Sequence, residues 1–133
     1  MDLLYDVLKT WYLNDKESDE NKRAILQEFR ALFRVVSVQI DLSRMNGQIM
    51  FSNLKHQIPD NANMLAKLLG KYEKAMDENL VKIIDEYLSA MVKIGQDFNS
   101  LTHGSAGIVD SEIEELDKMS KSGKTAIDKF LKN

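Results

Sequence analysis

The chain has 133 residues, a net charge of −3, no cysteine and a single proline. This length suits one domain with its own core, and the lack of cysteine excludes disulfide bonds and thiolate metal sites. No stretch approaches the about 18 uninterrupted apolar residues of a membrane span, and an acidic chain without a basic face argues against nucleic-acid binding. The N-terminus lacks a basic region before a sustained apolar run, so we expect a cytoplasmic protein, with signal-peptide-independent export left open.

Residues 1–13 are predicted to form a short helix, because apolar side chains recur on one face: Leu4, Val7, Leu8 and Trp11. Tyr5, Trp11 and Tyr12 form an aromatic cluster that could serve as a binding knob. We favour contact with the core, since a short helix needs large side chains to dock. In the polar segment that follows, Ser18 or Asp19 can cap the next helix.

Residues 18–57 are predicted to form one unbroken helix. Polar residues recur along it at three- and four-residue steps: Arg30, Arg34, Ser37, Asp41, Arg44, Gln48, Ser52 and Lys55. Two apolar stripes fill the remaining circumference: Ile25, Phe29, Leu32, Phe33, Val36, Ile40, Phe51 and Leu54, and then Ala31, Val35, Val38, Leu42, Met45 and Ile49. On this helix Ser43 and Gly47 would let another helix approach closely, although the glycine costs about 1 kcal/mol.

A β-hairpin is the competing interpretation of the same stretch. Asn46-Gly47 is the strongest short hairpin signal, and residues 36–42 alternate between apolar and polar. A hairpin would pair Met45 with Gln48, but its longer register would place Asn53 on the apolar face. The helical stripe has no such mismatch, so we favour the helix.

Residues 61–102 are predicted to form the third helix, after a tight turn at Pro59 that ends the second. One apolar stripe runs through this segment: Leu65, Leu69, Tyr72, Met76, Leu80, Ile83, Tyr87, Ala90, Ile94, Phe98 and Leu101. Asp77 could cap a new helix and break this one. The stripe passes Asp77 without a change of phase, so we favour continuity.

Residues 111–131 are predicted to form the fourth helix, which opens with a capping box of Ser111 and Glu114 after a glycine-containing loop. Its apolar residues are sparse and the segment Ser120-Lys121-Ser122-Gly123 interrupts them. We expect this helix to be the element that frays most readily.

Chemical motifs are weak throughout. His56 and His103 have no metal-binding spacing, and we expect both near helix ends. Glu112 and Glu115 form the Glu-x-x-Glu pattern with which helical nucleotide pyrophosphohydrolases hold magnesium. Such a site needs a second acidic pair, and the nearest pairs, Asp77-Glu78 and Asp85-Glu86, fall on mainly solvent-facing positions. A small metal-dependent hydrolase is therefore the second hypothesis; we expect no enzyme, no cofactor and no resident metal.

Paired long helices in a small acidic chain without cysteine resemble, in general style, the small helical partners of type VII-secreted toxins. Many phage and mobile-element proteins share the same style. The Trp-x-Gly motif of the toxin partners is absent from the predicted helical turn, where Ile58-Pro59-Asp60 stands instead. A partner or chaperone of a secreted toxin, or a mobile-element accessory protein, is therefore a third hypothesis.

We expect an all-α fold over residues 1–133: an antiparallel bundle built on a long two-helix hairpin, with two shorter helices at its open end. Neither short helix is long enough to cover the second apolar stripe beyond Val38. We therefore predict a partner interface at Val38, Leu42, Met45 and Ile49, with Arg34, Asp41 and Gln48 at its rim. The occupant would be a second copy, packed antiparallel, or another helical protein. The alternative is that the fourth helix bends over this stripe and buries it.

Overall fold

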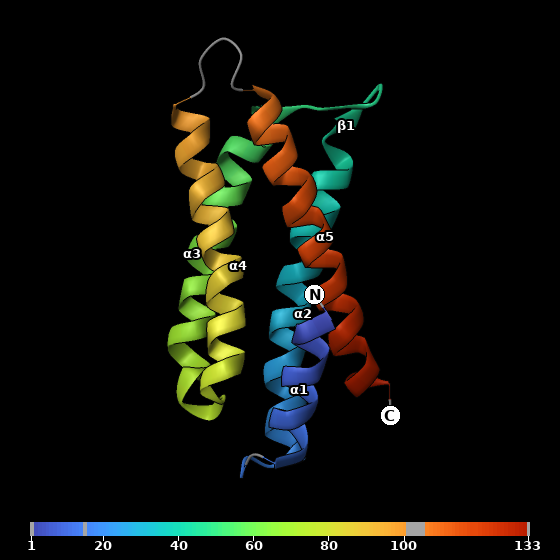
Figure 1. The fold of residues 1–133 in the computed structure, drawn as a ribbon, viewed down its shortest axis with the longest axis vertical. Coiled ribbons are helices and arrows are strands. Elements are labelled where there is room, and N and C mark those ends of the chain that lie inside the picture. The colour runs from blue at the N-terminus through green and yellow to red at the C-terminus, as the bar shows by residue number, and fades with distance from the viewer. Residues whose placement is uncertain (1, 15, 101–105, 133) are drawn as a thin grey trace.

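The structure, a computed structural model, describes residues 2–14, 16–100 and 106–132 and is all-α (Figure 1). Four long antiparallel helices form the body, in which α2 and α4 each pack against both α3 and α5. A short first helix packs against α4 and α5. The elements in order are α1 (Asp2–Asn14), α2 (Asp19–Leu42), β1 (Arg44–Met45), β2 (Gln48–Ile49), α3 (Phe51–Tyr72), the 3₁₀ turn η1 (Glu73–Ala75), α4 (Glu78–Asn99) and α5 (Ala106–Leu131).

The two N-terminal helices are as the sequence predicts as far as Leu42. The hydroxyl of Ser18 accepts a hydrogen bond from the backbone N–H of Asn21 and caps α2. Trp11 is buried and its indole N–H donates to the carbonyl of Ala75 at 2.9 Å, which ties α1 to η1, the turn between α3 and α4. The aromatic cluster therefore makes core contacts.

The prediction of one helix over residues 18–57 is wrong, because α2 ends at Leu42 and a two-residue hairpin follows. Asn46 and Gly47 have φ angles of 53° and 78°, the left-handed conformation of a type I′ turn. Met45 pairs with Gln48, as the competing interpretation predicts, but the ladder ends at Arg44 and Ile49. Gly47 makes no close helix contact, since a Cβ built there would have no atom within 4 Å.

The predicted reversal at Pro59 is also wrong, because Pro59 lies inside α3. Proline removes a backbone donor and crowds the preceding turn, which disfavours a helix interior. Here the ring packs against α4: a Cβ built on Gly95 would lie 3.5 Å from Cγ of Pro59. Burial of Leu54, Ile58 and Leu65 around it keeps α3 intact.

The chain reverses at residues 73–77 instead, so the predicted continuous helix over 61–102 is two helices. Asp77 caps α4 by accepting a hydrogen bond from the N–H of Leu80 at 2.8 Å. The apolar stripe keeps its phase because Leu69 and Leu80 are eleven residues apart, close to three helical turns. α4 ends at Asn99, and the predicted end at residue 102 lies outside the described residues.

α5 begins at Ala106, so Ser111 lies inside the helix and the predicted capping box is wrong. The helix expected to fray is packed against the bundle, with Ser120 and Gly123 buried. A Cβ built on Gly123 would lie 2.9 Å from Cε2 of Phe33, so this glycine lets α5 approach α2 closely. Small residues bring this part of α5 close to α2, and large apolar residues elsewhere on the helix, such as Ile113 and Leu116, are buried in the core.

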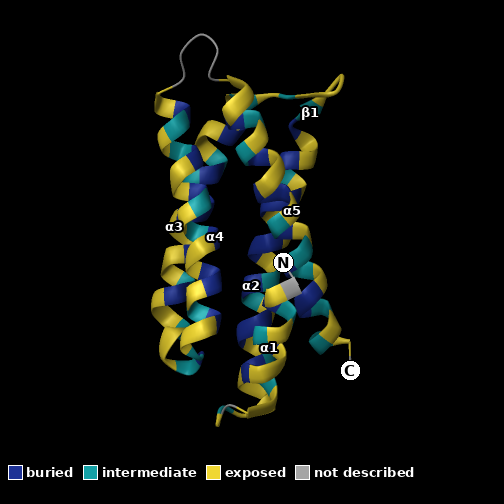
Figure 2. Ribbon diagram, viewed as in Figure 1, coloured by how far each residue is buried: buried dark blue, intermediate teal, exposed yellow. Residues whose placement is uncertain are grey.

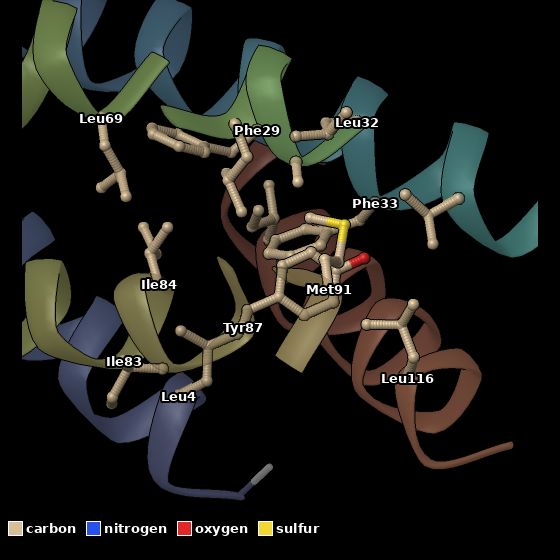
Figure 3. Close-up of a cluster of buried hydrophobic side chains, with 14 of the residues drawn as sticks. Leu4, Phe29, Leu32, Phe33, Leu69, Ile83, Ile84, Tyr87, Met91 and Leu116 are labelled. Atoms are coloured by element: carbon tan, nitrogen blue, oxygen red, sulfur yellow. The ribbon is translucent and has the colours of Figure 1, made fainter. Parts of the chain in front are cut away.

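The centre of the core lies between the four long helices, where Phe33 meets Tyr87 edge-on with ring centroids 4.8 Å apart (Figure 3). The hydroxyl groups of Tyr87 and Ser120 form a buried hydrogen bond, and burial raises the pKa of Tyr87. Leu116 and Met91 complete this layer. Among the described residues, no helix combines the length and apolar character needed to cross a bilayer.

Candidate interaction surface

One side of α2 carries exposed apolar residues, whereas its other sides are covered by α3 and α5. Val38 is 43 % exposed and Leu42 78 % exposed, although most of the helix's apolar side chains are buried. Ala31 and Val35 belong to the same exposed side, two turns and one turn before Val38. We call this set, Ala31, Val35, Val38 and Leu42, the α2 face. α5 does not bend over it, so the alternative in which the fourth helix buries the stripe is not realised.

The hairpin continues this exposed region by a different geometry from the one predicted. Met45 is 60 % exposed, while Ile49 is partly buried and packs against the core. Because neighbouring residues of a strand point to opposite faces, Arg44 and its pair Ile49 face the bundle, and Met45 and Gln48 face away. The hairpin is mainly exposed in Figure 2. Of the four predicted interface residues, three are therefore presented to solvent and Ile49 mainly supports the hairpin from beneath.

An ion-pair cluster centred on the buried Asp117 holds the hairpin in this orientation. Arg44 pairs with Glu114 and, at 2.7 Å, with Asp117 of α5. The hydrogen bond with Glu114 raises the pKa of Arg44. Asp117, whose side chain is 7 % exposed, also accepts hydrogen bonds from Ser37 and Lys121. The charged groups satisfy one another, so the base of the hairpin is fixed to α2 and α5.

A groove of about 380 Å³ between α2 and α3 borders the α2 face. Its lining is mainly apolar: Ala31, Leu32, Val35, Met64 and Leu68, with Glu28 and Lys67 at the rim. Glu28 accepts a hydrogen bond from the hydroxyl of Tyr72, which holds one side of the rim in place. The sequence interpretation missed Met64 and Leu68, although their four-residue spacing beside the predicted stripe was a usable signal.

The rim residues differ in how far they are already paired. Asp41 lies 3.1 Å from Lys121 and 3.6 Å from Arg44, with half of its side chain exposed. Gln48 is exposed at the hairpin. Arg34 is exposed on α2 and, in the part of the chain that the structure describes, makes no ion pair, hydrogen bond or ring contact.

The second hypothesis concerned acidic residues at the start of α5. Lys93 lies 3.3 Å from Glu112 and 2.9 Å from Asp97, so a cation of the protein already occupies this cluster. Partial burial and the neighbouring Asp97 raise the pKa of Glu112. Glu115 is exposed, and within residues 2–14, 16–100 and 106–132 no three His, Asp or Glu side chains come close enough to hold a metal ion.

The two histidines add no chemistry to this cluster. His56 is exposed in the second turn of α3, not at a helix end as expected, and His103 lies outside the described residues.

Comparison with known proteins finds no match for this chain. No family model, no curated protein and no solved structure matches it. The α2 face, the hairpin and the groove are therefore the features that bear on function.

Proposed function

We propose that this protein is a non-enzymatic interaction protein that docks another helical surface on the α2 face. The observation that carries the proposal is the exposure of Val38 and Leu42 on a helix that is otherwise packed on both flanks. Exposed apolar residues that are contiguous, and not scattered, are typical of partner surfaces.

The energetic reason lies in the burial that a partner would supply. Fully burying a valine or leucine side chain contributes about 1.5–3 kcal/mol. Val38, Leu42 and Met45 offer three large side chains in one region, and the neighbouring groove offers a concave apolar surface beside them. A helix that placed its own apolar stripe along this region would bury both at once.

The polar surroundings support a specific interface over a general apolar patch. Arg34 and Asp41 lie along one flank of the α2 face, and arginine is enriched in interfaces because it combines an apolar stem with directional donors. The occupant is a second copy of the chain or another helical protein. As part of the same proposal we place this interaction in the cytoplasm, because proteins there rarely contain disulfide bonds and this chain has no cysteine.

Site-specific photo-crosslinking in the cells that make the protein tests the proposal. A photoreactive residue replaces Leu42, and a matched control carries it at Lys82, an exposed position of α4. A discrete crosslinked product at position 42 and none at position 82 supports the α2 face as the docking surface. No product at position 42, or equal products at both positions, overturns it.

A further inference from the structure

The α2 face carries an unpaired positive charge. The chain has four arginines, and the other three are engaged: Arg23 donates to the carbonyls of Phe130 and Leu131, Arg30 pairs with Asp128, and Arg44 pairs with Glu114 and Asp117. Arg34 alone among them has no partner within the described chain. Its guanidinium lies beside an apolar stripe, where a carboxylate from another molecule could reach it.

A carboxylate stands on the same side of the same helix at a matching distance. Arg34 and Asp41 are seven residues apart, so they lie two turns apart and on nearly the same flank of α2. Val38 lies between them, toward the centre of the exposed side. Along this flank of the α2 face, a positive side chain is therefore followed by an apolar one and then by a negative one.

When a second α2 helix runs in the opposite direction, the positive end of this flank lies opposite the negative end of the other copy. We propose that the occupant of the α2 face is a second copy of this chain, packed with the two α2 helices antiparallel across a two-fold axis beside Val38. Arg34 of each copy then lies level with Asp41 of the other, and the symmetry makes the contact twice. This inference rests on the proposed function, because it names the occupant of the same surface.

The two-fold axis also decides which flanks meet. An axis perpendicular to both helices keeps equivalent flanks on the same side, so the charged flanks face each other and the apolar flanks do likewise. A parallel pair, whose axis runs along the helices, would instead place the charged flank of each copy against the apolar flank of the other, so Arg34 would not meet Asp41. The antiparallel arrangement is thus the one that the charges favour.

The same register also brings the exposed Leu42 against an apolar surface of the other copy. With the axis beside Val38, Leu42 of one copy lies level with a point between Ala31 and Val35 of the other, on the flank nearer α3. That level is the mouth of the groove between α2 and α3, which Met64 and Leu68 line from the α3 side. Leu42 of each copy therefore meets the groove of the other copy, so the same contact forms twice, as an isologous interface requires.

A different helical protein would have to supply an acid and a base at the same spacing as this chain. A second copy supplies both automatically, which favours it as the occupant. Exposed ion pairs contribute modestly to affinity but strongly to register and partner choice, so charge reversal is the sharpest probe.

Sedimentation equilibrium of wild type, Arg34→Glu and Asp41→Arg tests the inference at tens of micromolar. Wild type is expected to be dimeric. Each single variant turns both ion pairs into repulsive contacts and is expected to weaken dimerisation by about tenfold or more. An equimolar mixture of the two variants is expected to form a heterodimer, because both contacts are again between opposite charges. Lys118→Glu, which makes the same change of charge at an exposed position of α5, should leave the dimer intact.

The outcomes separate the inference from the proposed function. Wild-type dimers together with a mixture that stays monomeric would refute this register. A monomeric wild type that crosslinks from position 42 to a different chain overturns the second copy and leaves the proposed function standing. A monomeric wild type with no crosslink at position 42 overturns both. Circular dichroism of each variant shows that it is folded before its association is measured.

Discussion

Gly123→Ala is expected to destabilise the protein although it improves the helix propensity of α5. The β-carbon of alanine would lie 2.9 Å from Cε2 and 3.0 Å from Cδ2 of Phe33, well inside the 3.5–4.0 Å of a favourable carbon contact. Phe33 is buried and its ring contacts Tyr87 at a centroid distance of 4.8 Å, so the ring has little room to move. Either the ring leaves its position or α5 moves away from α2.

The magnitude follows from two opposing effects. Overpacking a dense core costs about 1–3 kcal/mol, while replacing glycine by alanine within a helix contributes about 1 kcal/mol in the other direction. A net loss of roughly 0–2 kcal/mol is expected on these two estimates. The matched control is Gly70→Ala in α3, where a Cβ would meet no atom within 4 Å. That variant keeps the propensity gain without the clash.

Thermal denaturation of the two variants measures the difference. Gly123→Ala is expected to melt below Gly70→Ala by roughly 3–12 °C, since about 1–3 kcal/mol separates them and each kcal/mol moves Tm by about 3–4 °C. A double-mutant cycle with Phe33→Leu should show a coupling of at least about 1 kcal/mol, because the smaller side chain makes room for the methyl group. If Gly123→Ala stabilises as much as Gly70→Ala, the close approach of α5 to α2 is refuted.

Three further predictions concern the hairpin and the ion pairs. Gly47→Ala should destabilise by about 1–2 kcal/mol in urea denaturation, because the left-handed φ of 78° is costly with a side chain; unchanged stability would contradict the type I′ turn. Asp117→Asn should cost about 1.5–3 kcal/mol by the same measurement, since it neutralises a buried carboxylate that accepts hydrogen bonds from the charged groups of Arg44 and Lys121; unchanged stability would contradict this role of Asp117. Burial raises the pKa of Asp128, but the ion pair with Arg30 holds this pKa below its ordinary value. The stability that Asp128 contributes at neutral pH is therefore lost as pH falls through its folded-state pKa. Asp128→Asn should therefore flatten the fall in Tm at acidic pH, and an unchanged acid profile would contradict the assignment.

The local pattern was sufficient to predict the helical class and several individual features. The apolar face of residues 1–13 and the cap at Ser18 are local properties, and both agree with the structure. The exposure of Val38 and Leu42 also agrees with the prediction, which followed from how much apolar surface the short helices can cover. Such features depend on residues within one or two turns of each other, so periodicity and capping chemistry describe them well.

The hairpin shows where local pattern fails. Residues 43–50 carry a helical stripe and a strong turn signal at once, and the choice between them depends on energies of long-range contacts. Arg44 finds Asp117 and Glu114 on α5, and Ile49 finds the core, only if the chain turns at Asn46-Gly47. The groove of the candidate surface was missed for the same reason, since Met64 meets α2 only through the reversal that this hairpin creates.

Tertiary contacts determine the backbone at both Pro59 and Asp77: the helix continues through the first and is interrupted before the second. Proline disfavours a helix interior, but the contact of its ring with Gly95 of α4 keeps α3 continuous. At Asp77 the stripe continues in phase, yet the chain reverses there so that α3 and α4 bury their stripes against each other. A periodic pattern records which side of a helix is dry. It does not record which other element covers that side, because this depends on contacts between residues far apart in the chain.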